Sequence, residues 1–370
     1  MRLNRFIGSA LVCVAGFTAF LCQASLTLGQ DARRAREVSA PRAIAATTAD
    51  DSIKSIDEEY HQELLRLDQR RLERLGRLAG RQKPAEAAAT YEQLFRLAIA
   101  GNLFGDAEPA AKALLASESP SRTAIALAHM VKIIAESDRG AYDESIESLR
   151  RAVAASDAAV KGGAPRTELP TGEIVGICEA YYQRLIHVGQ YDTARKAMGM
   201  LLGQAQRPVL KEFLSDRLRR LELVGKPAPK IAGPDVEGKR FDLADSKGKV
   251  VLVVFWASWC LPSAAEIESL QQVDEAYRGR GLRIVGIDLD TLAEAGQKPE
   301  LALANARRFL LDYNVTWPTL PNGQGENDYA KAYGVTEIPA NVLIAKDGTI
   351  AHIDLVHKNL EPMIARAVGE

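Results

Sequence analysis

The feature that most restricts the fold of this chain is an uninterrupted apolar run, Val250-Val-Leu-Val-Val-Phe255, which leads within a few residues into a helical pattern. A continuous run without polar alternation predicts a strand that is buried on both faces of a sheet. Cys260 stands at the junction, in Phe-Trp-Ala-Ser-Trp-Cys-Leu-Pro-Ser, and Pro262 suits the first helical turn because it lacks an N–H. Free backbone N–H groups and the helix dipole stabilise a thiolate at such a position. The segment therefore predicts a reactive cysteine at a helix N-terminus.

Strand and helix patterns alternate from this point to the end of the chain. A second buried strand is expected at Leu282–Asp288 and a helix at Glu300–Tyr313. Asn341–Ala345 and Ile350–Leu355 flank a Lys-Asp-Gly-Thr turn and predict a hairpin, and Leu360–Val368 predicts a closing helix. This order predicts an α/β domain with a mixed sheet flanked by helices.

The preceding part of the chain has a different pattern. Between Pro84 and Leu223 the apolar residues keep a helical period, with short Gly or Pro breaks. A turn of the form Gly-x-Tyr-Asp recurs at Gly140 and Gly189, and Phe104 begins a fainter third copy. A turn followed by a helix with small residues is typical of tetratricopeptide-type hairpins, although the irregular spacing fits a plain helical bundle almost as well. We expect an all-α, tetratricopeptide-like domain, whose concave face would bind a peptide or protein.

The two parts meet at Gly225-Lys-Pro-Ala-Pro229, a composition break whose two prolines favour an extended link. We therefore predict a helical repeat-like domain over residues 52–224 and an α/β domain over residues 225–370. Residues 31–51 are rich in Ala, Arg and Thr without an apolar period, which predicts a flexible linker.

The amino terminus has the features of an export signal. Arg2 and Arg5 precede an uncharged apolar run from Phe6 to Leu21. The run is shorter than the roughly 20 residues that a spanning helix needs, so cleavage is favoured over a retained membrane anchor. We predict a signal peptide at residues 1–30 and a protein exported to the periplasm or cell envelope.

Charge and cysteine content exclude several functions. The 47 basic and 48 acidic side chains nearly balance, which gives no support for nucleic acid as a partner. Beyond the predicted signal peptide only Cys178 and Cys260 remain, too few for a disulfide-stapled scaffold. The five histidines have no metal-ligand spacing and no glycine-rich phosphate loop is present, so we expect neither a metal nor a cofactor.

The stretch from Gly225 onward resembles the TlpA/ResA branch of extracytoplasmic thioredoxin-like thiol-disulfide oxidoreductases. The resemblance rests on these motifs: Gly225-Lys-Pro-Ala-Pro229, the turn Gly238 with Phe241 and Leu243, Phe255-Trp-Ala-Ser-Trp-Cys260, Asp347-Gly348, and the segment Tyr333-Gly-Val-Thr-Glu-Ile-Pro339, here called the proline loop. It implies a thioredoxin-like fold for residues 225–370 and a protein thiol or disulfide as the client. It also implies that Pro339 is cis and lies beside Cys260, where the backbone of Ile338 pairs with a bound substrate segment. Trp259 is expected to be an exposed platform beside the sulfur and, with Pro262, to contact substrate.

The sequence departs from this family at one decisive position. The family's active site is CxxC, and Ser263 here replaces the second cysteine. A hydroxyl cannot attack a mixed disulfide as a second sulfur does, although Ser263 could donate a hydrogen bond to the thiolate. The active site is therefore a degenerate CxxS, and we expect Cys260, Ser263 and Pro339 to be its catalytic residues.

Three interpretations of Cys260 follow. In the first, which we favour, it is the only attacking thiol of a monothiol reductase or isomerase, and an external thiol or a redox protein acts as electron donor to complete the cycle. In the second, the chain is a redox-inactive binding module that holds a client. In the third, Cys178 is the resolving thiol, although its apolar helical surroundings favour a buried, inert thiol. Ala257 stands where a peroxiredoxin has Thr or Ser, which disfavours a peroxidase.

Overall fold

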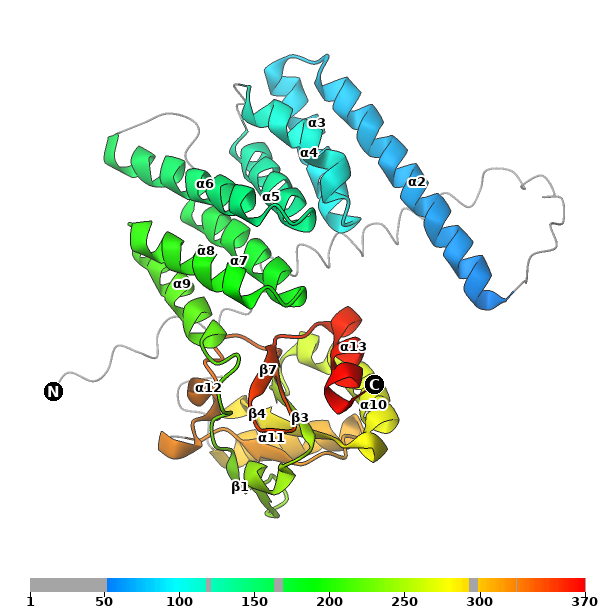
Figure 1. The fold of residues 1–370 in the computed structure, drawn as a ribbon, viewed down its shortest axis with the longest axis vertical. Coiled ribbons are helices and arrows are strands. Elements are labelled where there is room, and N and C mark those ends of the chain that lie inside the picture. Colours follow the sequence, from blue (N-terminus) through cyan, green and yellow to red (C-terminus); the bar gives the residue numbers. More distant parts are fainter. Residues whose placement is uncertain (1–51, 118–120, 163–168, 293–298, 324, 370) are drawn as a thin grey trace. The chain divides into compact units, whose positions relative to one another are not determined.

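The computed structural model describes residues 52–117, 121–162, 169–292, 299–323 and 325–369 (Figure 1). The predicted signal peptide and the whole of the predicted linker lie outside these residues. Within these ranges the chain forms two compact units, one from the described residues between 52 and 184 with residues 203–211, and the other from residues 185–202 with the described residues from 212 to 369. Within the described ranges, no helix combines the length and the apolar character that crossing a membrane requires.

Helices are the regular elements of the described chain up to residue 221, as the apolar period predicts. They are α2 (Ile53–Ala79), α3 (Pro84–Ala100), α4 (Phe104–Leu115), α5 (Arg122–Asp138), α6 (Tyr142–Gly162), α7 (Thr171–His187), α8 (Tyr191–Gln204) and α9 (Pro208–Leu221), coloured blue to green in Figure 1. Local signals set their starts. The hydroxyl groups of Ser52 and Ser121 accept hydrogen bonds from the first turns of α2 and α5, and Pro84 opens α3.

The weak internal repeat corresponds to one turn type that occurs three times. Asn102, Gly140 and Gly189 each adopt a left-handed backbone conformation, with φ of 55°, 77° and 74°. In each case the next residue donates its N–H to a carbonyl five residues earlier: Leu103 to Ala98, Ala141 to Glu136, and Gln190 to Leu185. This bond closes a helix end and reverses the chain, so the three predicted copies share a helix-terminating turn.

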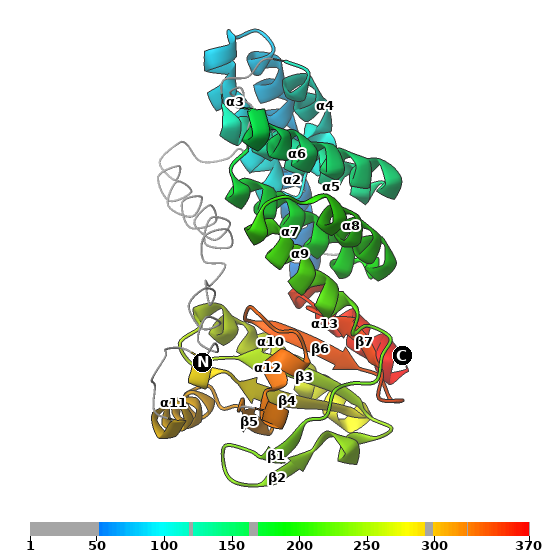
Figure 2. The same cartoon turned by 90° about the vertical axis from the view of Figure 1, so that its left-hand side faces the viewer.

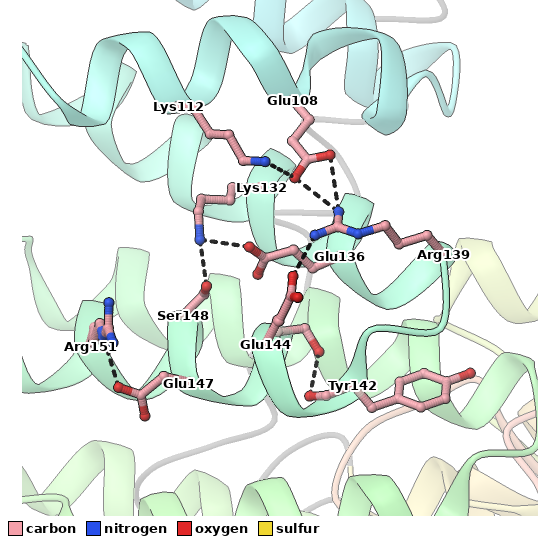
Figure 3. Close-up of polar contacts among 11 residues, drawn as sticks. Glu108, Lys112, Lys132, Glu136, Arg139, Tyr142, Glu144, Glu147, Ser148 and Arg151 are labelled. Atoms are coloured by element: carbon pink, nitrogen blue, oxygen red, sulfur yellow. Dashed lines mark hydrogen bonds and ion pairs between the residues drawn. The ribbon is translucent and has the colours of Figure 1, made fainter.

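Small buried residues and an ion-pair network hold α4, α5 and α6 together. The guanidinium of Arg139, at the end of α5, lies 2.9 Å from Glu108 of α4 and 2.7 Å from Glu144 of α6 (Figure 3). Lys132 of α5 also donates to Ser148 of α6. Alanines with no more than 1% exposure lie at the packed surfaces of α3, α4 and α5: Ala98, Ala107, Ala111, Ala124 and Ala128. Their small side chains allow the helix backbones to approach closely.

The second unit contains a five-stranded mixed sheet with the strand order β5-β4-β3-β6-β7. The strands are β3 (Val250–Trp256), β4 (Leu282–Asp288), β5 (Thr319–Pro321), β6 (Ala340–Ile344) and β7 (Ile350–Ile353). β3 pairs in parallel with β4 and antiparallel with β6, and every residue of β3 is buried. The central strand is therefore the fully buried run that the sequence predicts, in a thioredoxin-like fold.

Helices cover this sheet, as Figure 2 shows. They are α10 (Leu261–Tyr277), α11 (Pro299–Asp312), α12 (Tyr329–Ala332) and α13 (His357–Val368). Alternate residues of β3, from Val250 to Trp256, pack in one apolar cluster with α10, α11 and α13. On the other face of β3, the ring of Phe255 lies 5.6 Å from that of Tyr333.

Three short strands were not predicted from the sequence. β5, β1 (Ala232–Pro234) and β2 (Arg240–Asp242) have three residues each, too few to establish a period in the sequence. β1 and β2 form a separate antiparallel hairpin, and β5 extends the sheet beside β4.

Candidate active site

Cys260 lies at the junction of strand and helix, as the sequence predicts. β3 ends at Trp256, and the N–H of Cys260 donates to the carbonyl oxygen of Ala257 at 3.1 Å. Cys260 is the N-cap of α10, with extended backbone angles, and its own carbonyl accepts from Ala264 at 3.2 Å. Pro262 lies in the first turn of this helix. The sulfur is thus held at the N-terminus of α10, the positive end of the helix dipole.

The structure brings the cysteine and the proline loop together. The Cys260 sulfur lies 3.8 Å from the carbonyl oxygen of Ile338, and the Ile338–Pro339 peptide bond is cis, as the resemblance implies. The antiparallel pairing of β3 with β6 explains this contact, because Phe255 lies opposite Ala340 in the register. Cys260 has an exposed fraction of only 1%. The surrounding residues therefore cover Cys260 almost completely in this structure.

Exposed apolar residues flank the buried Cys260 in the chain. Trp259 is 37% exposed, Leu261 is 82% exposed, and Pro262 is exposed as well. By contrast, Trp256 is buried and stacks on Phe309, with their ring centroids 4.5 Å apart. Leu261 was not among the site residues predicted from the sequence, although an apolar residue beside the cysteine at the start of a helix was a visible signal. These residues form an apolar rim, defined here as Trp259, Leu261 and Pro262.

Ser263 lies on α10, three residues after Cys260, and is buried. Its hydroxyl oxygen has no hydrogen-bond partner among the described residues. The hydrogen bond that Ser263 could donate to the cysteine is therefore absent from this structure. A buried hydroxyl without a partner destabilises the folded state, since it loses its hydrogen bonds to water.

Two buried carboxyl groups, which were not identified from the sequence, support the active-site loop, defined here as residues 257–260 between β3 and α10. Asp290 accepts a hydrogen bond from the backbone N–H of Ser258 at 2.7 Å, and Asp288 accepts from the N–H of Asp290 at 3.0 Å. Burial raises the pKa of both groups, and the charge of Asp290 raises the pKa of Asp288 further. Asp288 is the last residue of the buried strand β4 and Asp290 lies two residues beyond it. Polar residues at a strand end were the signal that could have identified them.

Glu266 is a third acidic group beside the site, on the second turn of α10. Burial and the charge of Asp354 raise its pKa to about 7. A carboxyl group with this pKa changes its protonation state near neutral pH, so it can hold or release a proton under ordinary conditions.

Cys178 has the properties of an inert thiol. It lies on α7 and is fully buried, and burial together with the charge of Glu179 raises the pKa of its thiol to about 12. Cys178 and Cys260 are both free thiols in the structure. In the described ranges, no group of three or more His, Cys, Asp or Glu side chains is arranged to hold a metal ion.

Comparisons with known proteins match the same part of the chain. Residues 224–353 match the model of the AhpC/TSA family. Over 127 residues the chain is 33% identical to the thiol-disulfide oxidoreductase ResA of Bacillus thuringiensis subsp. konkukian, which covers 34% of this chain and 66% of ResA. It is 30% identical over 129 residues to the thioredoxin-like protein YneN of Bacillus subtilis, which covers 35% of this chain and 69% of YneN.

A solved structure of a thiol:disulfide interchange protein of the thioredoxin family from Chlorobium tepidum also matches. It has 26% sequence identity and a TM-score of 0.33, and the match covers 39% of this chain and 96% of that protein.

Proposed function

This chain belongs, through its carboxy-terminal part, to the TlpA/ResA-like family of thioredoxin-fold proteins. We propose that it is an exported monothiol thiol-disulfide oxidoreductase that acts through Cys260. One observation carries the proposal. The sulfur of Cys260 lies at the N-terminus of α10 and 3.8 Å from the carbonyl of Ile338. A nucleophilic sulfur beside the backbone of the proline loop suits a reaction with a disulfide in an extended peptide segment.

The proposed reaction begins when the Cys260 thiolate attacks one sulfur of a client disulfide. A bond forms between Cys260 and that sulfur, the client S–S bond breaks, and the second client sulfur leaves as a thiolate that takes up a proton. In isomerisation, another client thiolate attacks the mixed disulfide and releases Cys260, without net oxidation or reduction. In reduction, two molecules of an external thiol such as glutathione complete the cycle. The first attacks the Cys260 sulfur of the mixed disulfide and releases the client thiol, and the second attacks the resulting glutathione–Cys260 disulfide and releases Cys260, so that the two leave as oxidised glutathione.

The surroundings of the sulfur indicate the kind of client. The apolar rim would cover an apolar segment of a partially folded protein, while the backbone at Ile338 and Pro339 would pair with the segment that carries the disulfide. Because Ser263 supplies no second sulfur, the mixed disulfide would be resolved only by a thiol of the client itself or of another molecule. We further propose that the helical domain, residues 52–224, binds the client protein, and that the predicted signal peptide exports the chain to the periplasm or cell envelope.

A redox-inactive binding module is the second candidate function. The 1% exposure of Cys260 favours it, since reactive cysteines are usually accessible to their substrates. In this case the apolar rim and the helical domain would hold a client without forming a covalent bond.

Refolding of a protein with scrambled disulfides in a glutathione buffer separates the two candidates. The oxidoreductase predicts that the chain accelerates the recovery of native disulfides, and that Cys260→Ser removes this acceleration. Equal recovery with the wild-type chain, with Cys260→Ser and without added chain would leave the binding module as the better account.

A further inference from the structure

Helix α9 contacts the start of the proline loop, although α9 lies outside the residues 224–353 that match the family. From Glu212 onward this helix belongs to the same compact unit as the sheet. Gly334 in the loop has a left-handed φ of 62°, and a Cβ placed there would lie 3.6 Å from the Cα of Arg220. The backbone of α9 is therefore packed against the backbone of the loop.

Arg220 of α9 is buried and binds the first residue of the proline loop and strand β6, which follows the loop. Its guanidinium donates to the carbonyl oxygen of Tyr333 at 2.8 Å and to that of Asn341, two residues after Pro339, at 3.1 Å. It also forms a bidentate ion pair with Asp354. The planar guanidinium holds three partners in fixed directions, which a flexible lysine could not do. Arg220 thus fixes the two ends of the segment that carries Pro339.

Arg217, one turn earlier on α9, binds the middle of the same loop. Its guanidinium lies 2.9 Å from the carboxylate of Glu337, the residue directly before Ile338. The side chain of Arg217 is 8% exposed and lies over the ring of Phe213 at 5.0 Å, so its position is well defined. Glu337 is held one residue away from the carbonyl that contacts the Cys260 sulfur.

We propose that Arg217 and Arg220 are positioning residues, which hold the proline loop beside Cys260 so that a client segment can pair with it. The inference rests on the proposed oxidoreductase function, because the loop has this role only if Cys260 attacks a client disulfide. Neither arginine touches the sulfur. Arg217 acts through Glu337, and Arg220 acts through the carbonyl groups of Tyr333 and Asn341. Both arginines come from a helix that precedes the thioredoxin fold in the chain.

The test compares two disulfides in the full-length chain. A short peptide that contains one disulfide must pair with the proline loop, whereas the small aromatic disulfide dithiodipyridine needs only the sulfur. We expect Arg217→Ala and Glu337→Gln each to lower the rate of adduct formation with the peptide by about tenfold, while the rate with dithiodipyridine changes less than about twofold. The double variant should be no slower than either single variant, because both remove the same ion pair.

Conservative and control variants separate positioning from folding. Arg217→Lys should restore most of the peptide rate, because it keeps the charge. Arg219 is the matched control: it lies between the two arginines on α9 and pairs with Asp216 in an exposed ion pair, and Arg219→Ala should change neither rate. If Arg217→Ala does not fold, the more exposed Glu337→Gln provides the same comparison.

Hydrogen exchange provides a readout that does not depend on reaction. Amides of the proline loop should exchange faster in Arg217→Ala and Glu337→Gln than in the wild-type chain, with no change in β3. Unchanged peptide rates and unchanged loop exchange would overturn the inference, as would equal losses with both disulfides. If the wild-type chain reacts with neither disulfide, the oxidoreductase proposal fails. Hydrogen exchange then tests by itself whether Arg217 and Glu337 hold the proline loop in place.

Discussion

The Cys260 sulfur and the Ile338 carbonyl oxygen lie 3.8 Å apart, although 78 positions separate the two residues in the sequence. The sheet enforces this contact, because β3 runs into the cysteine, β6 runs out of the proline loop, and the two strands are antiparallel neighbours. The reactive atom and the backbone group expected to receive the client are therefore fixed by the most buried strands of the fold.

The apolar rim should determine affinity for a protein client but not the reactivity of the sulfur. Leu261→Ser removes a side chain that is 82% exposed, so it should leave the free energy of unfolding nearly unchanged. We expect the KM for an unfolded protein disulfide to rise several-fold, with little change in the rate for dithiodipyridine. The neighbouring exposed residue Ala265, on the same helix, offers a control as Ala265→Ser. A parallel loss with both disulfides would contradict a role in client binding.

Restoring a second cysteine should change the lifetime of the mixed disulfide. Ser263→Cys places a sulfur three residues after Cys260 on the same helix, within reach of a disulfide bond. We expect the client adduct to be released without added thiol, while a disulfide forms between Cys260 and the introduced sulfur, as detected by intact mass. Ser263→Ala is the matched control: it should keep the long-lived adduct and stabilise the fold by up to about 1 kcal/mol, since the hydroxyl has no partner. A lower unfolding temperature for Ser263→Ala would show that the hydroxyl is bonded.

Glu266 should make stability fall as pH rises towards 7. Its pKa is about 7 in the folded state and near 4.5 when the chain is unfolded, so the folded state binds an extra proton between these values. Above the folded pKa a buried carboxylate is charged and the folded state loses roughly 3 kcal/mol relative to pH 4. The Gln side chain of Glu266→Gln stays neutral at every pH. The free energy of unfolding of this variant, measured in urea titrations, should therefore rise relative to that of the wild-type chain between pH 5 and pH 8. A difference that does not vary with pH would contradict the assigned pKa.

Cys178 should not react in the folded chain. Its pKa of about 12 and its complete burial leave almost no accessible thiolate at pH 8. After iodoacetamide treatment, peptide mapping should find Cys178 unmodified in buffer and modified in denaturant. Modification of Cys178 in buffer, or a disulfide between Cys178 and Cys260, would instead support a resolving role for this residue.

The sequence predicted the parts of this fold that depend on local pattern. The buried run at β3, the proline at the start of α10 and the second run at β4 each define an element by their own residues, and their bounds agree with the structure within one residue. The family resemblance supplied the cis proline and its place beside Cys260. Neither source predicted Arg217 or Arg220, because their partners lie more than 100 residues away along the chain, at contacts fixed only by tertiary packing.

The Asp288–Asp290 pair shows the same limit at short range. Asp288 is the last residue of a strand that the sequence located correctly, and Asp290 lies two residues beyond it, yet charged residues at such positions are usually solvated. Their burial follows from the register that sets Trp256 beside Asp288, so that the active-site loop covers the carboxyl groups. Local pattern gave the position of these aspartates but not their environment.

The most direct test of a monothiol mechanism uses a client protein with a single cysteine, activated as a mixed disulfide with thionitrobenzoate, so that no client thiol remains to release Cys260. The fate of its adduct with the reduced chain is followed by intact mass. We predict one covalent adduct per chain, linked through Cys260, which persists until glutathione is added and does not form with Cys260→Ser. The absence of any adduct with the wild-type chain, or an adduct that resolves without an added thiol, would contradict this account.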